Sequence, residues 1–315
     1  MGCVLVTGAS GFIGSHVLHD FVHHGWKAVA YSTFTSGYKA IEDIMDKVSV
    51  IRGDVSDPVG VMEALRRHDV DCIVHCASLL TAASQRRPRD AFKVNVVGTL
   101  NVLEGARVFD VKRVVYLSST AVYGYTKEGE VVTEDHPKNP VTIYGATKLF
   151  SEHLGFNYFR DYGIEFVALR FPIVYGPWQS RRGFSSFKEI IEGPVEGRPV
   201  RIKEGGDQRY EAVYVLDVAH SIYLAAIREG VGGEAFNIGS GEMCSLHELA
   251  DIVREMVPGA DVEIGPGYDI AEPVRGPLDL SKARAKLGYE PKYSIKMGVR
   301  DYIDYLLGRK KLEYH

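Results

Sequence analysis

The sequence predicts an α/β fold, a doubly wound parallel sheet with a smaller C-terminal α/β domain. In the first half, apolar strand-like runs alternate with amphipathic helical stretches, a pattern typical of a parallel sheet with helices on both faces. The strand runs are apolar throughout rather than alternately polar, as expected when both faces are covered. After Phe171 the alternation gives way to Pro and Gly punctuation and shorter elements, which indicates a second, smaller α/β region.

Each element is predicted from the spacing of its apolar residues. The predicted strands are Val4–Thr7, Lys27–Tyr31, Val48–Arg52, Cys72–Cys76, Arg113–Ser118 and Glu165–Arg170. The predicted helices lie near Gly14–His24, Val59–His68, Arg89–Phe109 and Tyr144–Tyr162. We therefore assign the large sheet domain to residues 1–171, with a later segment near 208–240 returning to it, and the smaller domain to residues 172–315.

The composition excludes several kinds of partner. Of the 315 residues, 45 % are apolar and 25 % are charged, the mix of an ordinary globular protein. The net charge of −4, from 37 Lys and Arg against 41 Asp and Glu, favours neither nucleic acid nor an anionic membrane as a partner. Neither a bilayer-spanning apolar run nor a signal-like segment is found, so we expect a cytoplasmic protein.

The cysteines and histidines do not predict a metal site. Most of the cysteines lie in apolar, strand-like segments and are interpreted as buried small residues. The histidines His19, His23 and His24 are expected on the exposed face and end of one helix, because no carboxylate or thiol cluster accompanies them.

A glycine-rich turn joins the first predicted strand to the first helix. Gly8, Gly11 and Gly14 form the pattern G-x-x-G-x-x-G. The first glycines let the backbone turn sharply and approach a pyrophosphate, and the last lets the helix pack close to the sheet. The N-terminus of the helix then offers backbone N–H groups and a positive dipole end to the anion, and Phe12 and Ile13, just before it, are expected to contact the cofactor. After the first strand of a βαβ unit this pattern predicts a Rossmann-type dinucleotide-binding domain, and a glycine turn without a ligand is the alternative.

The end of the second predicted strand leaves the choice of dinucleotide open. An acidic residue usually binds the adenosine ribose hydroxyls there, whereas here Ser32 follows Tyr31, with neither an acidic residue nor an arginine before Gly37. Ser32 can bond either a ribose hydroxyl or a 2′-phosphate. We take NAD as the expected cofactor and keep NADP as the alternative. After the third strand, Asp54 either accepts from the adenine amino group or caps the next helix.

A tyrosine and a lysine are predicted to carry the chemistry. Tyr144 and Lys148 lie four residues apart, on one face of a predicted helix. A nearby ammonium lowers a tyrosine pKa from its usual ~10, so Tyr144 can take a proton from a substrate hydroxyl while a hydride leaves the same carbon. Upstream, Ser118 and Ser119 end a strand at the sheet edge where ligands bind in open α/β sheets. Ser119 can bond the reacting oxygen, and turn capping is the alternative.

Together, these motifs resemble the extended short-chain dehydrogenase/reductase family, in its NAD-dependent epimerase/dehydratase branch, over nearly the whole chain. The blocks that match are Thr7–Gly14, Gly53-Asp54, His75–Ala77, Asn95–Thr99, Ser118–Gly124, Tyr144–Lys148, Leu169–Pro172, Tyr175–Pro177, Val213–Ala219, Phe236–Gly241 and Ser281–Ala283. The resemblance implies that Tyr144 is the acid/base, Lys148 its electrostatic partner and ribose contact, and Ser119 the hydroxyl that holds the substrate oxygen. It also implies a homodimer through the two long helices, and further cofactor contacts at Val55, Cys76, Ala77, Ser78, Asn95, Ser118 and Pro172.

Three places depart from the pattern of that branch. Thr120 and the residue after it stand where the dehydratases carry an acidic pair, so a 4,6-dehydratase would lack its acid and base. Ile173 replaces an Asn that contacts the ligand in nucleotide-sugar epimerases. Tyr210 replaces an Arg that binds the diphosphate, although Arg209 precedes it and Arg275 falls near the second expected phosphate contact.

We expect an NAD(P)-dependent sugar-modifying enzyme, most simply a nucleotide-sugar (UDP-hexose-like) 4-epimerase. The cofactor would take hydride from C4 while Tyr144 takes the proton, and the flat 4-keto sugar would rotate and receive hydride on its other face. Ser119 and Thr120 would contact the sugar, and Arg209 and Arg275 would clamp the diphosphate. The alternative is a net dehydrogenase or reductase of a smaller sugar, sugar acid or ketone. A nicotinamide-binding regulator without turnover is disfavoured because the whole catalytic set is present.

Overall fold

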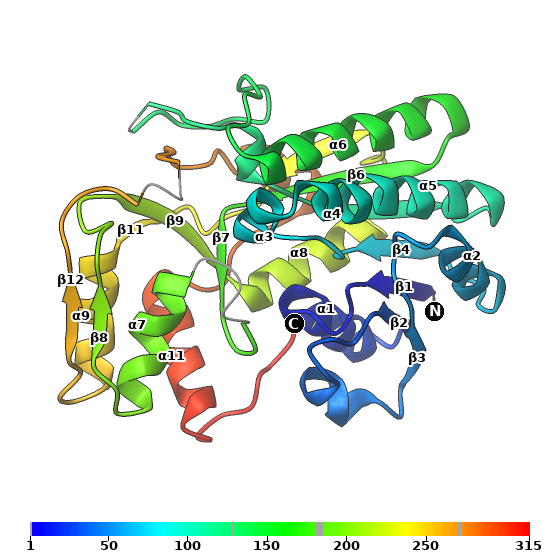
Figure 1. Cartoon of the computed structure of the whole chain (residues 1–315). Helices are drawn as coiled ribbons and strands as arrows, with labels where there is room; N and C mark the ends of the chain where they lie inside the picture. Colours follow the sequence, from blue (N-terminus) through cyan, green and yellow to red (C-terminus); the bar gives the residue numbers. More distant parts are fainter. Residues whose placement is uncertain (1, 128, 180–184, 270–272) are drawn as a thin grey trace.

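A parallel sheet forms the centre of the large unit of the chain (Figure 1). The structure, a computed structural model, describes residues 2–127, 129–179, 185–269 and 273–315. Within these residues the sheet has seven parallel strands in the order β10-β6-β5-β4-β1-β2-β3. They are β1 (Cys3–Thr7), β2 (Lys27–Ser32), β3 (Val48–Arg52), β4 (Cys72–His75), β5 (Arg113–Ser119), β6 (Glu165–Phe171) and β10 (Glu234–Asn237). The predicted α/β fold is confirmed, and the first six strands end within one residue of their predicted bounds.

Helices cover both faces of the sheet (Figure 1). One face packs against α1 (Phe12–His23) and α8 (Val215–Ile227). The other face packs against α2 (Pro58–Arg66), α5 (Gly98–Val108) and α6 (Ile143–Tyr162). The helix predicted near Arg89–Phe109 is present in three parts, because a π-helical turn, η2 (Phe92–Val97), joins α4 (Pro88–Ala91) to α5. Shorter helical segments are η1 (Lys39–Ile44), α3 (Thr81–Arg86) and η3 (Thr120–Val122).

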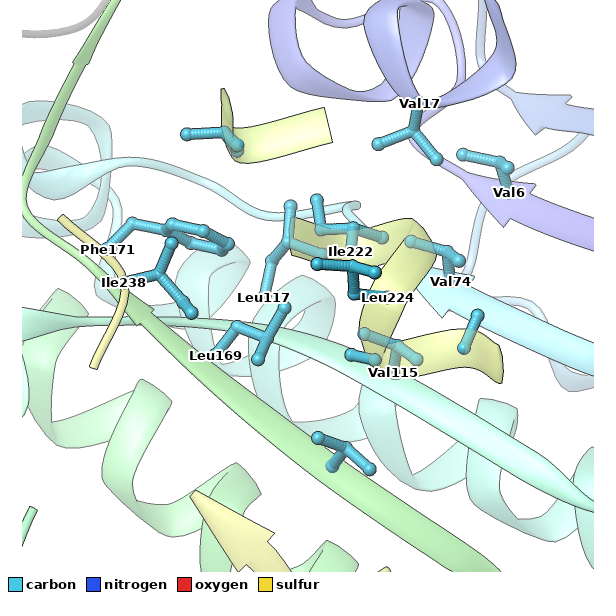
Figure 2. Close-up of a cluster of buried hydrophobic side chains, with 14 of the residues drawn as sticks. Val6, Val17, Val74, Val115, Leu117, Leu169, Phe171, Ile222, Leu224 and Ile238 are labelled. Carbon is cyan, nitrogen blue, oxygen red and sulfur yellow. The ribbon is translucent and has the colours of Figure 1, made fainter. Parts of the chain in front are cut away.

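Aliphatic side chains from neighbouring strands form the layer between the sheet and α1. Val6, Val74 and Val115 are register partners on β1, β4 and β5, and all three are fully buried. Figure 2 shows them in one cluster with Val17 of α1 and Ile222 of α8. Burying one such side chain contributes roughly 1.5–3 kcal/mol to the stability of the fold. This layer therefore stabilises the strands whose carboxyl ends carry the site.

A second hydrophobic cluster forms the smaller C-terminal unit. Its strands are β7 (Ile173–Tyr175), β9 (Arg209–Tyr214) and β11 (Met243–Ser245) in one sheet, and β8 (Val200–Ile202) and β12 (Val262–Ile264) in another. Its helices are α7 (Ser185–Val195), α9 (Leu246–Met256) and α11 (Ile295–Leu306). By contrast, α8 and β10 pack with the large sheet, as does α10 (Ser281–Leu287), which lies beyond the segment near 208–240 that we expected to return there.

The position predicted for His19 is wrong. Its side chain is 7 % exposed, whereas His23, near the end of the helix, is exposed as predicted. The Nδ1 atom of His19 lies 2.8 Å from the carbonyl oxygen of Ser15, and its Nε2 atom lies 2.9 Å from Asp43 in η1. The side chain is buried because η1 packs against α1 and because the rings of Trp178 and Tyr314 lie 5.2 and 5.3 Å from the His19 ring, centroid to centroid.

Across the described residues, no helix combines the length and apolarity needed to cross a membrane. In the same residues, no three His, Cys, Asp or Glu side chains converge as metal ligands would. All four cysteines are free thiols.

Candidate active site

The glycine turn between β1 and α1 packs backbone against backbone. Gly8 has a φ of +66°, and a Cβ atom there would lie 2.8 Å from the backbone N of Ala77. A Cβ at Gly14 would lie 2.4 Å from the carbonyl oxygen of Gly8, and one at Gly11 would lie 3.0 Å from the same atom. At Gly8 and Gly14 only glycine fits without displacing the backbone, and at Gly11 a Cβ would make a tight contact. The turn is therefore a cradle bare of side chains, which fits the phosphates of a dinucleotide.

The first turn of α1 faces this cradle. Phe12 and Ile13 begin the helix after Gly11, which has no side chain to cap it, so their backbone N–H groups are available to an anion. The end of β1 is held by Thr7, whose Oγ1 atom accepts from the backbone N–H of Ala77 at 3.2 Å and lies 2.7 Å from a ring nitrogen of the buried His75.

At the ends of β2 and β3 lie the residues expected near the adenosine. The hydroxyl of Ser32 lies 2.8 Å from that of Ser10 in the glycine turn, and both residues are buried. Asp54 accepts from the backbone N–H of Ser56 at 2.9 Å, so it stabilises the turn after β3. The helix cap expected of Asp54 is wrong, because the N-cap of α2 is Asp57, which accepts from the backbone N–H of Val59. Val55 is buried against the start of α5.

The segment Cys76–Ser78 runs from the glycine turn toward α6. Buried Asn95 holds the turn that follows, because its Oδ1 atom accepts from the Oγ–H of Ser78 at 3.2 Å and from the backbone N–H of Leu79 at 2.7 Å. Its Nδ2 atom donates to Thr147 of α6 at 3.0 Å. Asn95 thus ties the cofactor side of the site to the helix that carries Tyr144.

The predicted tyrosine and lysine lie together at the start of α6. Thr142 caps this helix, and Tyr144 is its second residue and half-buried. The Nζ atom of buried Lys148 donates to the carbonyl oxygen of Leu117 in β5 at 2.6 Å. The same atom lies 5.5 Å from the ring centroid of Tyr144 and 4.8 Å from that of Tyr116. The pair therefore stands at the carboxyl end of β5, beside the edge where ligands bind.

A buried carboxylate one turn further along α6 was not predicted. Burial lowers the pKa of Lys148 to about 7, and the charges of Cys76 and Glu152 act in the opposite direction. Glu152 accepts from the hydroxyl of Ser118 at 2.5 Å and pairs with Arg170 of β6. The hydroxyl of Ser118 is thus directed to the protein interior. The four-residue spacing from Lys148 was a signal that could have identified Glu152.

Ser119 and Thr120 turn the chain out of β5. The Oγ atom of Ser119 accepts from the backbone N–H of Ala121 at 3.2 Å, so the hydroxyl caps η3 and retains an O–H that can reach a ligand. Thr120 is buried and lies in the wall of a pocket together with Pro172.

This pocket is an open hollow of about 370 Å³, part of it open to solvent, and it lies between the two units of the chain. Its lining comprises Thr120, Pro172, Ile173, Gln208, Arg209, Tyr210, Glu211, Pro273, Arg275, Gly276 and Leu278. The Nε atom of Arg275 donates to the carbonyl oxygen of Gly124 at 3.1 Å, which holds the side chain at the pocket. Arg209 lies at the rim, paired with Glu248 at 2.9 Å and donating to the carbonyl oxygen of Met243.

Glu211 is a second carboxylate that sequence reasoning missed. It accepts from the backbone N–H groups of Leu278 at 2.7 Å and Gly241 at 3.2 Å, and it is buried at the pocket wall. Burial raises its pKa to about 7, against the effect of these backbone donors. The residue thus joins β9 to the segments of Gly241 and Leu278.

The fold and these residues define an α/β enzyme of the dinucleotide-dependent class. The chain belongs to the NAD dependent epimerase/dehydratase family, whose model matches residues 4–239. This confirms the resemblance read from the sequence.

Individual relatives match over nearly their full length. The UDP-glucose 4-epimerase of Mycolicibacterium smegmatis is 30 % identical, over 98 % of this chain and 99 % of that protein. The crystal structure of the Thermus thermophilus UDP-glucose 4-epimerase with NAD has a TM-score of 0.88 at 31 % identity, covering 97 % of this chain and 99 % of that one. The Thermotoga maritima UDP-glucose 4-epimerase with UDP-glucose has a TM-score of 0.87 at 28 % identity, with the same coverage.

Proposed function

We propose that the chain is an NAD-dependent nucleotide-sugar 4-epimerase whose substrate is a UDP-hexose. The observation that carries this proposal is that Tyr144 and Lys148 lie together at the carboxyl end of β5, the strand that leads into Thr120 of the pocket wall. The proposal is supported by full-length relatives that are named UDP-glucose 4-epimerases.

The chain's own residues would carry out the proton transfer of this reaction. Bound NAD supplies a ring that reversibly accepts a hydride. The phenol oxygen of Tyr144 takes the proton from the C4 hydroxyl and later returns it. The Lys148 ammonium favours the phenolate form of Tyr144. Burial lowers the pKa of Lys148 to about 7, and the charges of Cys76 and Glu152 oppose this shift. The hydroxyl of Ser119 bonds the same sugar oxygen and holds it toward Tyr144.

The pocket would receive the rest of the substrate. Thr120 and Pro172 form the wall near the sugar, and Arg275 supplies a cation for the diphosphate. Arg209 is at the pocket rim but is bonded to Glu248, so it would join the clamp only by exchanging this carboxylate for a phosphate.

We also infer a cytoplasmic homodimer. Free thiols fit a reducing compartment. Phe92, Leu100 and Val108 recur every eight residues along the η2–α5 helix and are 56 %, 37 % and 51 % exposed, and Phe150 on the adjacent α6 is 51 % exposed. Such a surface on two packed helices suits a self-complementary interface.

A net dehydrogenase of a smaller sugar, sugar acid or ketone is the second candidate. It is favoured by one observation, the engagement of Arg209 with Glu248, which leaves Arg275 as the arginine held at the pocket by its own bond. In that reaction the same Tyr144 and Lys148 act, but the product leaves after one hydride transfer.

An assay of the purified protein with NAD separates the two functions. We expect UDP-glucose and UDP-galactose to interconvert without a net change in nicotinamide absorbance. A stoichiometric absorbance change with a sugar or aldonate panel supports the dehydrogenase, and the absence of any interconversion contradicts the epimerase. Tyr144→Phe should lower the rate by about 10²–10⁴-fold while NAD still binds. Tyr125→Phe, in the exposed loop after η3, is the matched control.

A further inference from the structure

Two register partners end their strands side by side at the adenosine end of the cradle. Ser32 of β2 is paired with Arg52 of β3, and adjacent strands lie about 4.8 Å apart. The partners Ala30 and Val50, two residues earlier on the same strands, pack in the cluster under α1. Since side chains two apart on a strand share a face, Ser32 and Arg52 both lie on the α1 face, where the glycine turn is found.

Two serine hydroxyl groups lie where the end of β2 meets the glycine turn. The Oγ atoms of Ser10 and Ser32 lie 2.8 Å apart, and both residues are buried. One hydroxyl donates to the other, and the Oγ atom of Ser32 also accepts from the backbone N–H of Phe34 at 3.5 Å. One O–H and two lone pairs are left for a ligand. These groups are neutral, so they can bond a sugar hydroxyl without repelling an anion.

A cation stands beside them at the end of β3. Arg52 is exposed, and in the described part of the chain its guanidinium forms neither an ion pair nor a side-chain hydrogen bond. The acidic residue that follows it, Asp54, accepts from the backbone N–H of Ser56. The carboxylate of Asp43 in η1 lies against His19. The charge of Arg52 is therefore available to an anionic ligand.

We propose that Ser10, Ser32 and Arg52 form a subsite for a 2′-phosphate on the adenosine ribose, so that the protein accepts NADP as well as NAD. The inference rests on the proposed dinucleotide-dependent function and concerns which dinucleotide it uses. A carboxylate at the end of β2 would accept from the ribose hydroxyls and repel a phosphate. Hydroxyls with an adjacent guanidinium would instead attract a phosphate, because they offer a neutral hydrogen-bond donor and a charge-assisted hydrogen bond.

Equilibrium titrations of the purified protein with NADH and NADPH test this subsite, with nicotinamide fluorescence as the readout. In the wild type the Kd for NADPH should lie within about tenfold of that for NADH. Arg52→Ala should raise the Kd for NADPH about tenfold and change that for NADH less than about twofold. Ser32→Asp should shift preference toward NADH, and Arg66→Ala, an exposed arginine on α2, is the matched control.

Several outcomes would overturn the proposal. One is a wild-type Kd for NADPH more than about tenfold above that for NADH, and another is an equal loss of both cofactors in Arg52→Ala. Because a variant can misfold, the wild type is also titrated with 2′,5′-ADP and 5′-AMP, and weaker binding of 2′,5′-ADP also counts against the subsite. If neither NADH nor NADPH binds, the dinucleotide-dependent function itself fails together with this inference. NADH binding without NADPH binding overturns only the subsite.

Discussion

Glu152 of α6 and Arg170 of β6 form a two-point ion pair inside the protein. The Oε1 and Oε2 atoms of Glu152 accept from the Nε and Nη2 atoms of Arg170 at 2.9 and 2.7 Å, and the two side chains are 1 % and 4 % exposed. Glu152 also accepts from Ser118, and Arg170 also donates to the hydroxyl of Tyr123 at 2.8 Å. The pair joins the helix of Tyr144 to the two strands behind the site.

Removing one partner of this pair should destabilise the protein strongly. Glu152→Gln leaves the buried guanidinium of Arg170 without a counter-charge, which costs about 3–5 kcal/mol in the free energy of unfolding. Urea unfolding measures this cost, and Glu63→Gln, whose partner Arg67 is exposed, should change stability by less than about 1 kcal/mol. The double variant Glu152→Met/Arg170→Met should recover much of the loss. A loss no greater than that of Glu63→Gln would show that the pair does not hold the strands to the helix.

The charge of Lys148 should make stability depend on pH in a defined direction. Its pKa is 10.5 in the unfolded chain and about 7 when buried. Between these values only the unfolded state carries the proton, so the free energy of unfolding rises with pH by up to about 1.4 kcal/mol per unit. Below pH 7 both states are protonated, and the cost of burying the ammonium is at its full value.

The variant Lys148→Met isolates this effect, because it cannot titrate. Unfolding of the cofactor-free wild type and variant is compared from pH 7 to 10.5, the range set by the two pKa values. The wild type should gain stability relative to the variant throughout that range. Lys112→Met, at an exposed position, should run parallel to the wild type. Parallel curves for Lys148→Met as well would mean that the lysine stays charged when buried.

Local sequence patterns predicted the glycine turn and the proximity of Tyr144 and Lys148. The contacts between residues that are distant in sequence could not be predicted in this way. The glycine turn and the Tyr144–Lys148 pair were predictable because each lies within one turn or helix, where spacing sets geometry. The Glu152–Arg170 pair joins residues of two different elements, and no local spacing links a carboxylate to a strand arginine. The engagement of Arg209 depends on β9 pairing with β11 and on the position of α9 beside them. These contacts follow from tertiary packing, so they were not accessible before the fold.

Alanine variants at two glycines should separate the effect of backbone strain from the effect of close backbone approach. Gly8→Ala introduces both, because φ is +66° and the new methyl would meet Ala77 at 2.8 Å. Gly37→Ala introduces only strain, since its φ is +77° and nothing lies within 4 Å. We expect Gly37→Ala to cost about 1 kcal/mol and to keep NAD affinity, and Gly8→Ala to cost more and to abolish NAD binding.

Gly14→Ala completes this comparison. It introduces a methyl 2.4 Å from the carbonyl oxygen of Gly8 without a positive φ, so it should also lose NAD binding. Thermal unfolding and NAD titration of the three variants measure both effects. Equal stability losses in Gly8→Ala and Gly37→Ala, with NAD binding kept in both, would show that the close approach has no role.

Phe150, one of the exposed aromatic residues of α6, should decide the oligomeric state. Phe150 lies beside the apolar stripe of the η2–α5 helix, and in a two-fold interface it would be buried twice. Phe150→Glu therefore places two carboxylates in a desolvated interface, at a cost of several kcal/mol in association free energy. Sedimentation velocity should show a dimer for the wild type and a monomer for Phe150→Glu. Val59→Glu, at a 67 % exposed position on α2, should remain dimeric. A monomeric wild type at micromolar concentration would rule out the dimer, whereas a dimeric Phe150→Glu would place the interface on another surface.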